Sequence, residues 1–230
     1  MKFKDLREFI AFLEEKGDLR RIKVPVSADL EIAEIADRAV KSGGPALLFE
    51  NVEGKDMPLA INLFGTHRRM AWALGVEDVT ELTDRLRGLL ELLQGPSPGM
   101  RNKMRALGQL AAVAKTQPKT VKKAPCQDVV VTGDDVDINV LPALKCWPMD
   151  AGRFITLPLV ISRDPTTGTR NVGTYRMQVY DRQTTGMHWQ THKVGAHHYR
   201  SSEEKQQSRL DVAVALGADP ATLWTGSLPL

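Results

Sequence analysis

The feature that most constrains the fold of this chain is a series of short apolar runs in its second half. These runs are rich in β-branched and aromatic residues, and polar turn signals such as DPTTG and DRQTTG separate them. They are DVVVTG (128–133), FITLPLVISRD (154–164), NVGTYRMQVYD (171–181) and GMHWQTH (186–192). Such runs joined by hairpin-type turns are typical of antiparallel strands. We therefore expect an antiparallel sheet or barrel in this part of the chain.

The first third of the chain alternates helix and strand signals. KDLREFIAFLEEKGDLRRIKV (4–24) carries an apolar stripe at helical spacing, with Asp5 and Glu8 at capping-box spacing and Gly17 as the stop. SADLEIAEIADRAVKSGG (27–44) repeats the helix pattern, and PALLFEN (45–51) and PLAINLFG (58–65) are typical of short buried strands. This order predicts an α/β arrangement in the first third.

The middle of the chain reads as helical and then as a linker. TELTDRLRGLLELLQG (80–95) and GMRNKMRALGQLAAVAK (99–115) are amphipathic, and the breaker GPSPG separates them. The basic, proline-containing stretch KTQPKTVKKAP (115–125) is interpreted as a solvated linker, because no aromatic residues interleave for base stacking. We expect an α+β protein with an N-terminal α/β domain and helical connector over 1–124 and a second domain over 125–230.

The last apparent element is LDVAVALGADPATLW (210–224), an apolar segment followed by Asp-Pro at a helix start. The sequence then stops at TGSLPL without a further element. We interpret the 230 residues as the N-terminal part of a longer polypeptide.

Composition narrows the class of protein. Thirty-one basic and 28 acidic residues are interspersed and leave a net charge of +3, so no nucleic-acid or membrane footprint is expected, while a small anionic ligand stays open. Cys126 and Cys146 form no CxxC spacing and are too few for a disulfide framework, which favours the reducing cytoplasm. No apolar run is long enough to span a bilayer, although peripheral contact with the inner face of the cell membrane stays open.

Four of the five histidines lie in MHWQTHKVGAHHYR (187–200). His188 and His192 are four residues apart, a spacing that aligns them on a helix and equally on a strand. Trp189 stands where the HExxH motif requires glutamate, so a zinc protease is disfavoured. Metal binding and ordinary hydrogen bonding both remain open for this pair, and His197 and His198 are interpreted as an exposed turn after Gly195.

A second constellation lies in NVGTYRMQVYD. Asn171 offers a hard oxygen to a cation such as Mg or Mn, and Arg176 offers a fork that matches a carboxylate or phosphate. The two residues differ in strand parity, so a bulge at Gly173 is needed to bring them to one side. The alternative is that Arg176 merely pairs with a surface acid.

Several long blocks together are similar to one family. They are GGPALLFENVEG, NLFGTHRRMAWALG, APCQDVVVTGDDVDINVLPALKCWPMDAGRFIT, NVGTYRMQVYDRQTTGMHWQTHKVGAHHY and VAVALGADP, in family order along essentially the whole chain. The chain resembles the UbiD family of decarboxylases, and within it the ubiquinone-pathway branch of 3-polyprenyl-4-hydroxybenzoate decarboxylases.

The resemblance implies a fold, a reaction and a set of partners. It implies an N-terminal α/β domain, a split β-barrel flavin-binding domain that this chain carries in part, and a C-terminal domain that helps to build a homo-oligomer. The implied cofactor is prenylated FMN, made by a flavin prenyltransferase and held with a divalent metal, usually Mn, and a monovalent cation, often K. The implied reaction is the non-oxidative decarboxylation of a small aromatic acid.

The resemblance also carries individual residues over. Asn171 and His192 match metal ligands, and Arg176 matches the arginine that holds the substrate carboxylate. The matches to cofactor-contacting segments are Thr174, Tyr175, Arg176, His188, Trp189, Gln190, Lys193 and Val194. The family's third metal ligand, a glutamate, and its catalytic acids fall after Leu230, so we expect the 230 residues alone to bind flavin weakly and to lack turnover.

Three rival functions are kept. One is a non-catalytic flavin- or anion-binding module on the same barrel, and another is a decarboxylase of a different aryl or acrylic acid. The third is a plain zinc hydrolase.

Overall fold

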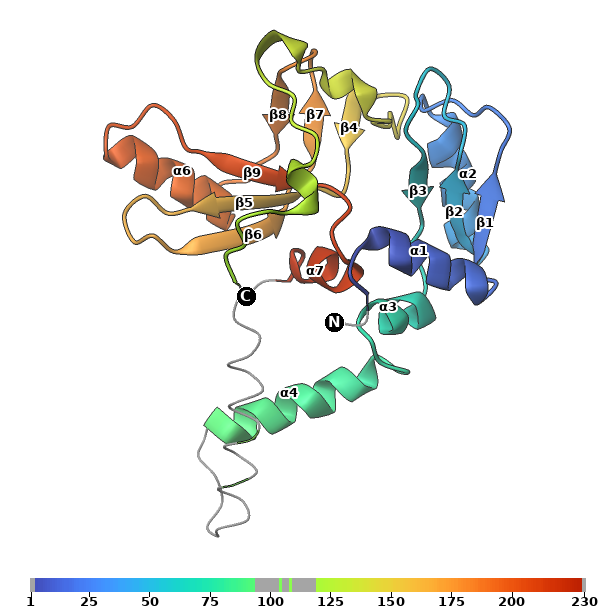
Figure 1. Cartoon of the computed structure of the whole chain (residues 1–230), viewed down its shortest axis with the longest axis horizontal. Coiled ribbons are helices and arrows are strands. Elements are labelled where there is room, and N and C mark those ends of the chain that lie inside the picture. Colours follow the sequence, from blue (N-terminus) through green and yellow to red (C-terminus); the bar gives the residue numbers. More distant parts are fainter. Residues whose placement is uncertain (1–2, 94–103, 105–107, 109–118, 229–230) are drawn as a thin grey trace. The chain divides into compact units, whose positions relative to one another are not determined.

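The computed structural model describes residues 3–93, 104, 108 and 119–228 (Figure 1). Contacts divide the chain into two compact units, Met1–Gly75 with Val136–Leu230, and Val76–Asp135. The second unit contains α4 (Thr80–Leu93), which confirms the first amphipathic helix of the middle region. The helix expected over 99–115 lies almost wholly outside the described residues.

The first unit begins with a small mixed sheet and its helices. The strands are β1 (Leu19–Ile22), β2 (Ala46–Phe49) and β3 (Leu59–Ile61), in that order, with β1 and β2 parallel and β2 and β3 antiparallel. The helices are α1 (Leu6–Glu15), α2 (Glu31–Lys41) and α3 (His67–Ala73). A parallel pair needs a crossover, which α2 supplies between β1 and β2. The α/β order expected for the first third is confirmed.

Local chemistry explains where α1 begins and ends. Asp5 Oδ1 accepts the Glu8 N–H at 2.9 Å and so caps the first turn. The Glu8 carboxylate accepts the Lys4 N–H at 2.7 Å instead of that of Asp5, so the expected capping box forms only in its forward half. Gly17 follows the helix with φ +70°, a left-handed conformation that glycine adopts without strain.

A buried ion pair joins three segments of this region. Arg69 on α3 is fully buried, and its Nη1 donates to Asp18 Oδ1 at 3.0 Å and to the carbonyl of Gly44 at 3.1 Å. Asp18, only 6% exposed, also accepts from Nη2 of Arg68 at 3.1 Å. The pair therefore connects the residue before β1, the loop before β2 and α3.

A later segment completes the core around β2. Leu144 is buried in one cluster with Val26, Ile32 and Phe49. The neighbouring Lys145 forms an isolated parallel bridge with Asp29. Residues beyond 136 thus pack into the first region, and the domain boundary expected near residue 124 stays a prediction.

Two open antiparallel sheets follow. One has the order β4 (Arg153–Ile155), β7 (Met177–Val179), β8 (Thr185–Met187), and the other has the order β6 (Arg170–Thr174), β5 (Leu159–Arg163), β9 (Val212–Ala215). Their strands run in different directions in Figure 1. The expected α+β class with antiparallel strands is confirmed.

Each of the two longest predicted strands is divided between these sheets. FITLPLVISRD supplies β4 and then, after Pro158, β5; NVGTYRMQVYD supplies β6 and then β7, with Tyr175 and Arg176 at the corner. Proline has no N–H for a ladder, so Pro158 fits a corner better than a strand centre. Strands that switch sheets at bends form such corners in packed β-structure.

The strand expected over DVVVTG is wrong. Residues 128–133 form no strand, and Val129 and Val130 are 80% and 71% exposed. One-turn 3₁₀ helices flank this stretch at Pro125–Gln127 and Gly133–Asp135. A β-branched run forms a strand only when a partner strand or apolar surface receives it, and the described residues offer it neither.

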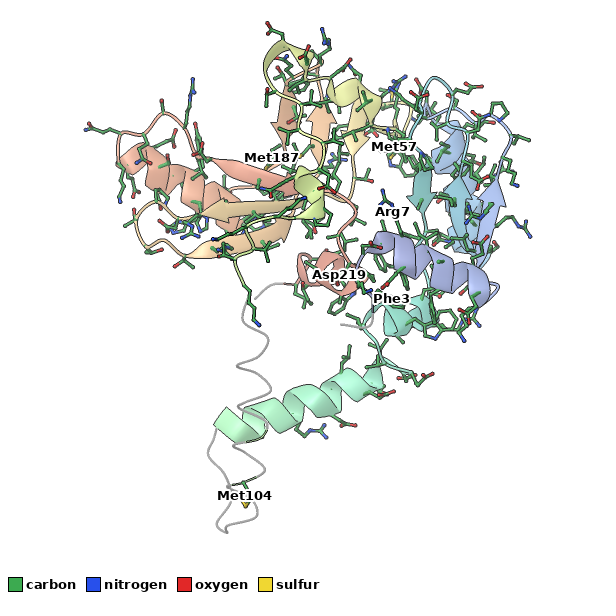
Figure 2. The ribbon with its side chains drawn as sticks, viewed as in Figure 1. Phe3, Arg7, Met57, Met104, Met187 and Asp219 are labelled. Atoms are coloured by element: carbon green, nitrogen blue, oxygen red, sulfur yellow. The ribbon has the colours of Figure 1, made fainter. Side chains whose placement is uncertain are left out.

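Helices α6 (Val194–Glu204) and α7 (Pro220–Thr225) lie next to the sheet of β6, β5 and β9. Asp219, labelled at the start of α7 in Figure 2, caps the Thr222 N–H at 3.1 Å, and Pro220 occupies the first turn. β9 and α7 confirm the apolar segment and helix start expected in residues 210–224. In the part of the chain that the structure describes, no helix combines the length and apolarity needed to cross a bilayer.

Candidate functional site

The site begins on β6, where Asn171 lies opposite Ser162 of β5 in an uninterrupted register. The bulge expected at Gly173 is therefore absent, because Gly173 pairs regularly with Val160. Its lack of a side chain serves another purpose: a Cβ there would come within 2.7 Å of the Tyr175 ring. Gly173 thus provides the space into which Tyr175 folds back over β6.

Tyr175 joins β6 to the start of α6. It is 8% exposed, and its hydroxyl oxygen accepts the Asn171 Nδ2 donor and the Gly195 N–H, each at 3.3 Å. Its ring packs edge-on against Trp189, with centroids 6.2 Å apart. Gly195 has no room for a side chain, since a Cβ would lie 2.7 Å from the Trp189 indole nitrogen. Strand corner, indole and helix start therefore form one packed group.

The first turn of α6 presents backbone donors. Lys193 is its N-cap residue in an extended conformation and makes no side-chain cap hydrogen bond, while the Gly195 N–H already donates to the Tyr175 hydroxyl. The other N–H groups of this first turn, together with the helix dipole, favour a bound anion. The exposed side chain of Lys193 adds a positive charge at the same point.

His192 immediately precedes this cap. β8 ends at Met187 and α6 begins at Val194, so His188 and His192 share neither a strand nor a helix face. Neither the helix alignment nor the strand alignment that their spacing allows therefore occurs. The intervening chain is held by the His188 N–H donating to the Arg176 carbonyl at 3.1 Å and the Lys193 N–H donating to the Gln190 carbonyl at 2.9 Å.

One cavity of about 550 Å³ gathers much of the predicted site. Its volume lies in the range usual for small-molecule and cofactor pockets. The predicted residues that line it are Asn171, Thr174, Tyr175, His192, Lys193 and Val194. Both predicted metal ligands therefore face the same space as the N-terminus of α6. The remaining predicted residues, Arg176, His188, Trp189 and Gln190, do not line it.

Residues after α7 complete the cavity and were missed from the sequence. Gly226, Ser227 and Leu228 line it, and the carbonyl of Gly226 accepts the Thr174 N–H at 2.9 Å. A Cβ on Gly226 would come within 2.3 Å of Leu159. No local pattern in TGSLPL signals this contact.

Arg176 lies at the corner between β6 and β7, outside this cavity. Its guanidinium carbon is 4.7 Å from the centre of the Phe154 ring. A guanidinium over an aromatic ring is attracted to the π face of that ring, and its N–H groups can still donate to a carboxylate. No acid forms an ion pair with Arg176 among the described residues, contrary to the surface-pair alternative.

Trp189 forms the wall behind Tyr175. Its indole packs also near Tyr199 of α6, with centroids 6.3 Å apart. Its Nε1 is buried without a hydrogen-bond partner within the described ranges. His188 and Gln190 on either side of it are exposed.

The metal-binding capacity of the described residues is limited. No group of three or more His, Cys, Asp or Glu side chains that could hold a metal occurs among them. Asn171 and His192 offer one amide oxygen and one imidazole, a donor set that suits Mn or Mg with ligands still to be added. Burial, with Asp150, raises the pKa of the Cys146 thiol above its usual range.

His197 and His198 lie in α6, so the exposed turn expected for them is wrong. His198 is 2% exposed, and its Nδ1 lies 3.0 Å from Ser162 Oγ on β5. His197 stays exposed, 3.9 Å from Asp164 Oδ2. The buried pair of Ser162 and His198 fixes α6, and so the helix end at the site, to the sheet. Burial lowers the pKa of His198 below 6.5, Asp164 opposes this effect, and His197 adds to it.

We expect α6 to lose stability at mildly acidic pH. Because His198 has a lower pKa in the folded chain than in the unfolded chain, the unfolded chain takes up the proton first as pH falls below about 6.5. The free energy of unfolding then falls by at most about 1.4 kcal/mol per pH unit for this proton, until the folded-state pKa is reached. Urea unfolding followed by circular dichroism at a series of pH values measures this slope.

The control for this slope is a replacement that does not titrate. His198→Asn keeps a partner for Ser162 and removes the titrating group, so the slope between neutral and mildly acidic pH should flatten. His197→Asn should leave the slope as in the parent protein. Equal slopes for His198→Asn and the parent protein would contradict the assignment.

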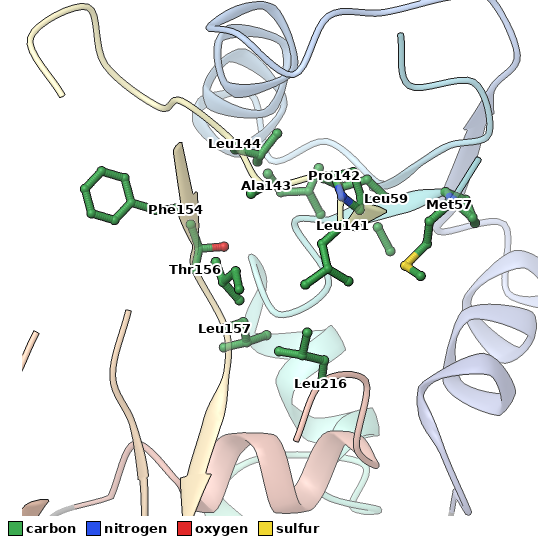
Figure 3. Close-up of a pocket in the computed structure, with 14 residues that line it drawn as sticks. Met57, Leu59, Leu141, Pro142, Ala143, Leu144, Phe154, Thr156, Leu157 and Leu216 are labelled. Atoms are coloured by element: carbon green, nitrogen blue, oxygen red, sulfur yellow. The ribbon is translucent and has the colours of Figure 1, made fainter. Parts of the chain in front are cut away.

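A second cavity is apolar and has a different character (Figure 3). It has a volume of about 210 Å³, and Leu59, Leu141, Leu157 and Leu216 are among its lining residues. In Figure 3 the Phe154 ring points away from these side chains. No titratable residue lines the cavity, so it offers no side-chain acid or base.

Two domains of one known protein family match this chain. The N-terminal domain of 3-octaprenyl-4-hydroxybenzoate carboxy-lyase matches residues 10–87, and the Rift-related domain of the same family matches residues 119–230. These two regions of the chain are thus UbiD-family domains. The UbiD family expected from the sequence blocks is confirmed. The ubiquinone-pathway branch is a finer assignment that these two matches do not make.

Relatives of this UbiD-family chain include proteins of known structure. The UbiD-class enzyme HmfF from Pelotomaculum thermopropionicum, in complex with prenylated FMN (prFMN), is 29% identical with a TM-score of 0.76, over 97% of this chain and 47% of that one. Vanillic acid decarboxylase of Sedimentibacter hydroxybenzoicus is 26% identical with a TM-score of 0.79, over 99% of this chain and 46% of that one.

An uncharacterized protein of Archaeoglobus fulgidus is 51% identical over all 230 residues, which make up 46% of its length. The chain thus spans less than half of the length of each of these relatives.

Proposed function

We propose that the protein to which this sequence belongs is a prenylated-FMN-dependent decarboxylase of aromatic acids, and that the cavity between β6 and α6 holds the phosphate end of the flavin. The observation that carries the proposal is the gathering of Asn171, His192 and Lys193 around one cavity at the N-terminus of α6. An anionic group and a divalent cation are the ligands that such a donor set fits.

The residues present fit a flavin phosphate with its metal. Asn171 Oδ1 and the His192 imidazole would bind a divalent cation such as Mn. A third ligand for this cation would come from outside these cavity residues, and a monovalent cation such as K would bind in addition. Lys193 and the first-turn N–H groups of α6 other than that of Gly195, which donates to Tyr175, would bind the phosphate. Tyr175 and Trp189 would exclude water behind these ligands.

The reaction needs an electron sink and a held substrate. When bound, the prenylated flavin supplies that sink for the electron pair left on carbon as CO₂ departs. Arg176, whose guanidinium lies over the Phe154 ring, would hold the substrate carboxylate through its N–H groups. The acid that returns a proton to carbon, like the third metal ligand, is implied only by the family resemblance.

The finer assignments rest on the sequence blocks. We propose 3-polyprenyl-4-hydroxybenzoate as the substrate, in ubiquinone biosynthesis, with a flavin prenyltransferase as cofactor supplier and a homo-oligomer as the working form. Two proteins of similar structure are named for other aromatic acids: vanillic acid decarboxylase and 3,4-dihydroxybenzoic acid decarboxylase. Cytoplasmic localisation with peripheral membrane contact stays a prediction.

The deciding experiment expresses the whole protein together with a flavin prenyltransferase. Flavin absorbance, bound metal and CO₂ release are then measured with prenylated hydroxybenzoate, vanillate and 3,4-dihydroxybenzoate. Release of CO₂ from one of these acids by flavin-loaded protein supports the proposal. Protein that binds FMN and releases no CO₂ from any aryl or acrylic acid is a non-catalytic flavin module, and protein that never takes up flavin contradicts both.

We expect Arg176→Ala to separate cofactor binding from turnover. Arg176 lies outside the cavity, so flavin and metal content should match the parent protein. The rate of CO₂ release should fall by about a hundredfold or more, as when one donor to a reacting oxyanion is removed. Arg163→Ala, an exposed arginine at the end of β5, is the matched control and should keep full activity. Retained decarboxylation in Arg176→Ala would refute the assigned role.

A further inference from the structure

The hydroxyl of Tyr175 is placed where it can control a neighbouring ligand. Its oxygen accepts one hydrogen bond from a side-chain amide on β6 and one from a backbone amide of α6. A phenolic oxygen has two lone pairs, and these two donors use both. The hydroxyl therefore connects two elements through one atom, in a residue that is only 8% exposed.

We propose that Tyr175 is a positioning residue that orients the Asn171 amide, so that Oδ1 and not Nδ2 is presented to a divalent cation. The inference rests on the proposed function, because it assumes a cation bound by Asn171 and His192. It adds a role to a residue that the family resemblance marks only as a cofactor contact.

The chemistry of the amide requires such an orienting group. An asparagine amide has one end that accepts and one end that donates, and a hard cation binds only the oxygen. Because Nδ2 of Asn171 donates to Tyr175, Oδ1 is the end left to face the cavity that Asn171 lines. Residues that orient a metal ligand in this way tune the affinity of the site.

The second hydrogen bond connects the Tyr175 hydroxyl to the helix that follows His192. Gly195 lies in the first turn of α6, and His192 lies just before the Lys193 cap of that helix. The Tyr175 hydroxyl therefore restrains the helix start that follows His192 at the same time as it restrains Asn171. Two glycines leave room for this arrangement, since a Cβ on Gly173 would collide with the Tyr175 ring and a Cβ on Gly195 would collide with Trp189.

The test replaces the hydroxyl and keeps the ring. Tyr175→Phe in the whole protein retains the packing against Trp189, so its thermal midpoint should shift by only a few degrees. The dissociation constant for Mn²⁺, measured by electron paramagnetic resonance titration in the presence of FMN, should rise about 10- to 100-fold, as for other groups that orient metal ligands. Tyr199→Phe is the control, because Tyr199 also lies near Trp189 but is 42% exposed. It should bind Mn²⁺ like the parent protein.

A rescue variant separates orientation from a structural role. Asn171→Asp presents an oxygen at both ends of the side chain and needs no orienting partner. Tyr175→Phe combined with Asn171→Asp should therefore bind Mn²⁺ about as tightly as Asn171→Asp alone. An equal loss of affinity on Tyr175→Phe in both backgrounds would overturn the proposal.

Other outcomes distinguish this inference from the proposed function. If Tyr175→Phe binds Mn²⁺ like the parent protein while Asn171→Ala does not, the orienting role is refuted and the metal site stands. If Asn171→Ala and His192→Ala both bind Mn²⁺ normally, the proposed site itself is refuted. Should Tyr175→Phe not fold, the Asn171 side-chain amide protons decide: they must be protected from exchange in the Mg²⁺-loaded parent protein, and unprotected protons overturn the inference.

Discussion

His192→Ala is expected to remove the divalent metal and the flavin together from the whole protein. His192 lines the same cavity as Asn171 and directly precedes the α6 cap, so its imidazole is the nitrogen ligand proposed for the cation beside the phosphate. Loss of a residue that merely orients a ligand costs about 10- to 100-fold in metal affinity, so loss of a ligand should cost at least about 100-fold. Without the cation, the negative charge of the phosphate lacks its main partner.

Metal analysis and flavin absorbance of the purified variant measure both losses at once. His197→Ala is the matched control, because that imidazole is exposed on α6 and does not line the cavity. It should keep metal, flavin and activity. A His192→Ala protein that retains flavin but not metal would show that the two ligands bind independently, contrary to the proposed phosphate site.

Asp18→Ala is expected to lower the free energy of unfolding by about 3–5 kcal/mol, the usual cost of leaving one member of a buried ion pair without the other. Arg69 has a side chain that is only 1% exposed, and its Nε and Nη2 already have no hydrogen-bond partner among the described residues. Removal of Asp18 would leave Nη1 with the Gly44 carbonyl alone. The buried charge would then be almost uncompensated.

Arg68→Ala provides the contrast for this prediction. Arg68 binds the same carboxylate at a similar distance, but its side chain is 65% exposed, so its loss should cost less than about 1 kcal/mol. Adding Arg69→Met to Asp18→Ala should recover part of the lost stability, because it removes the unpaired charge. Chemical denaturation of all variants measures the differences, and an equal cost for Asp18→Ala and Arg68→Ala would contradict the assignment.

The helices and strands of the first third were predictable because their signals are local. The Asp5 cap, the apolar stripe of α1 and the Gly17 stop all act within a few residues of one another. The buried pair of Asp18 and Arg69 was not predictable in the same way. Nothing near either residue in the sequence indicates that α3 places Arg69 against the residue before β1.

The strands of the second half were predictable in type but not in their pairing. Residues of FITLPLVISRD and NVGTYRMQVYD do form strands, yet each run serves two sheets. Pro158 is a local signal for the first corner. The corner at Tyr175 has no such signal, since it depends on the tertiary packing of that ring under α6.

The candidate site was reachable from the sequence only through family resemblance. Spacing alone left the role of His192 open, and it linked Asn171 to Arg176 through a bulge that does not exist. In the structure, Asn171 instead lies beside Tyr175 and lines the same cavity as His192. The contribution of Gly226–Leu228 depends on where α7 docks, which no local pattern indicates.

The pairing of β5 has a consequence for the order of folding. β5 pairs with β6, which follows it closely in the sequence. Its other neighbour, β9, lies much further along the chain and pairs Ala215 with Leu159. Gly226, which lines the cavity, comes still later in the sequence. Closing so long a stretch of chain is slow compared with forming a hairpin or helix. During refolding, helical content should therefore return well before the capacity to bind a ligand, and the cavity should be among the last features of the molecule to form.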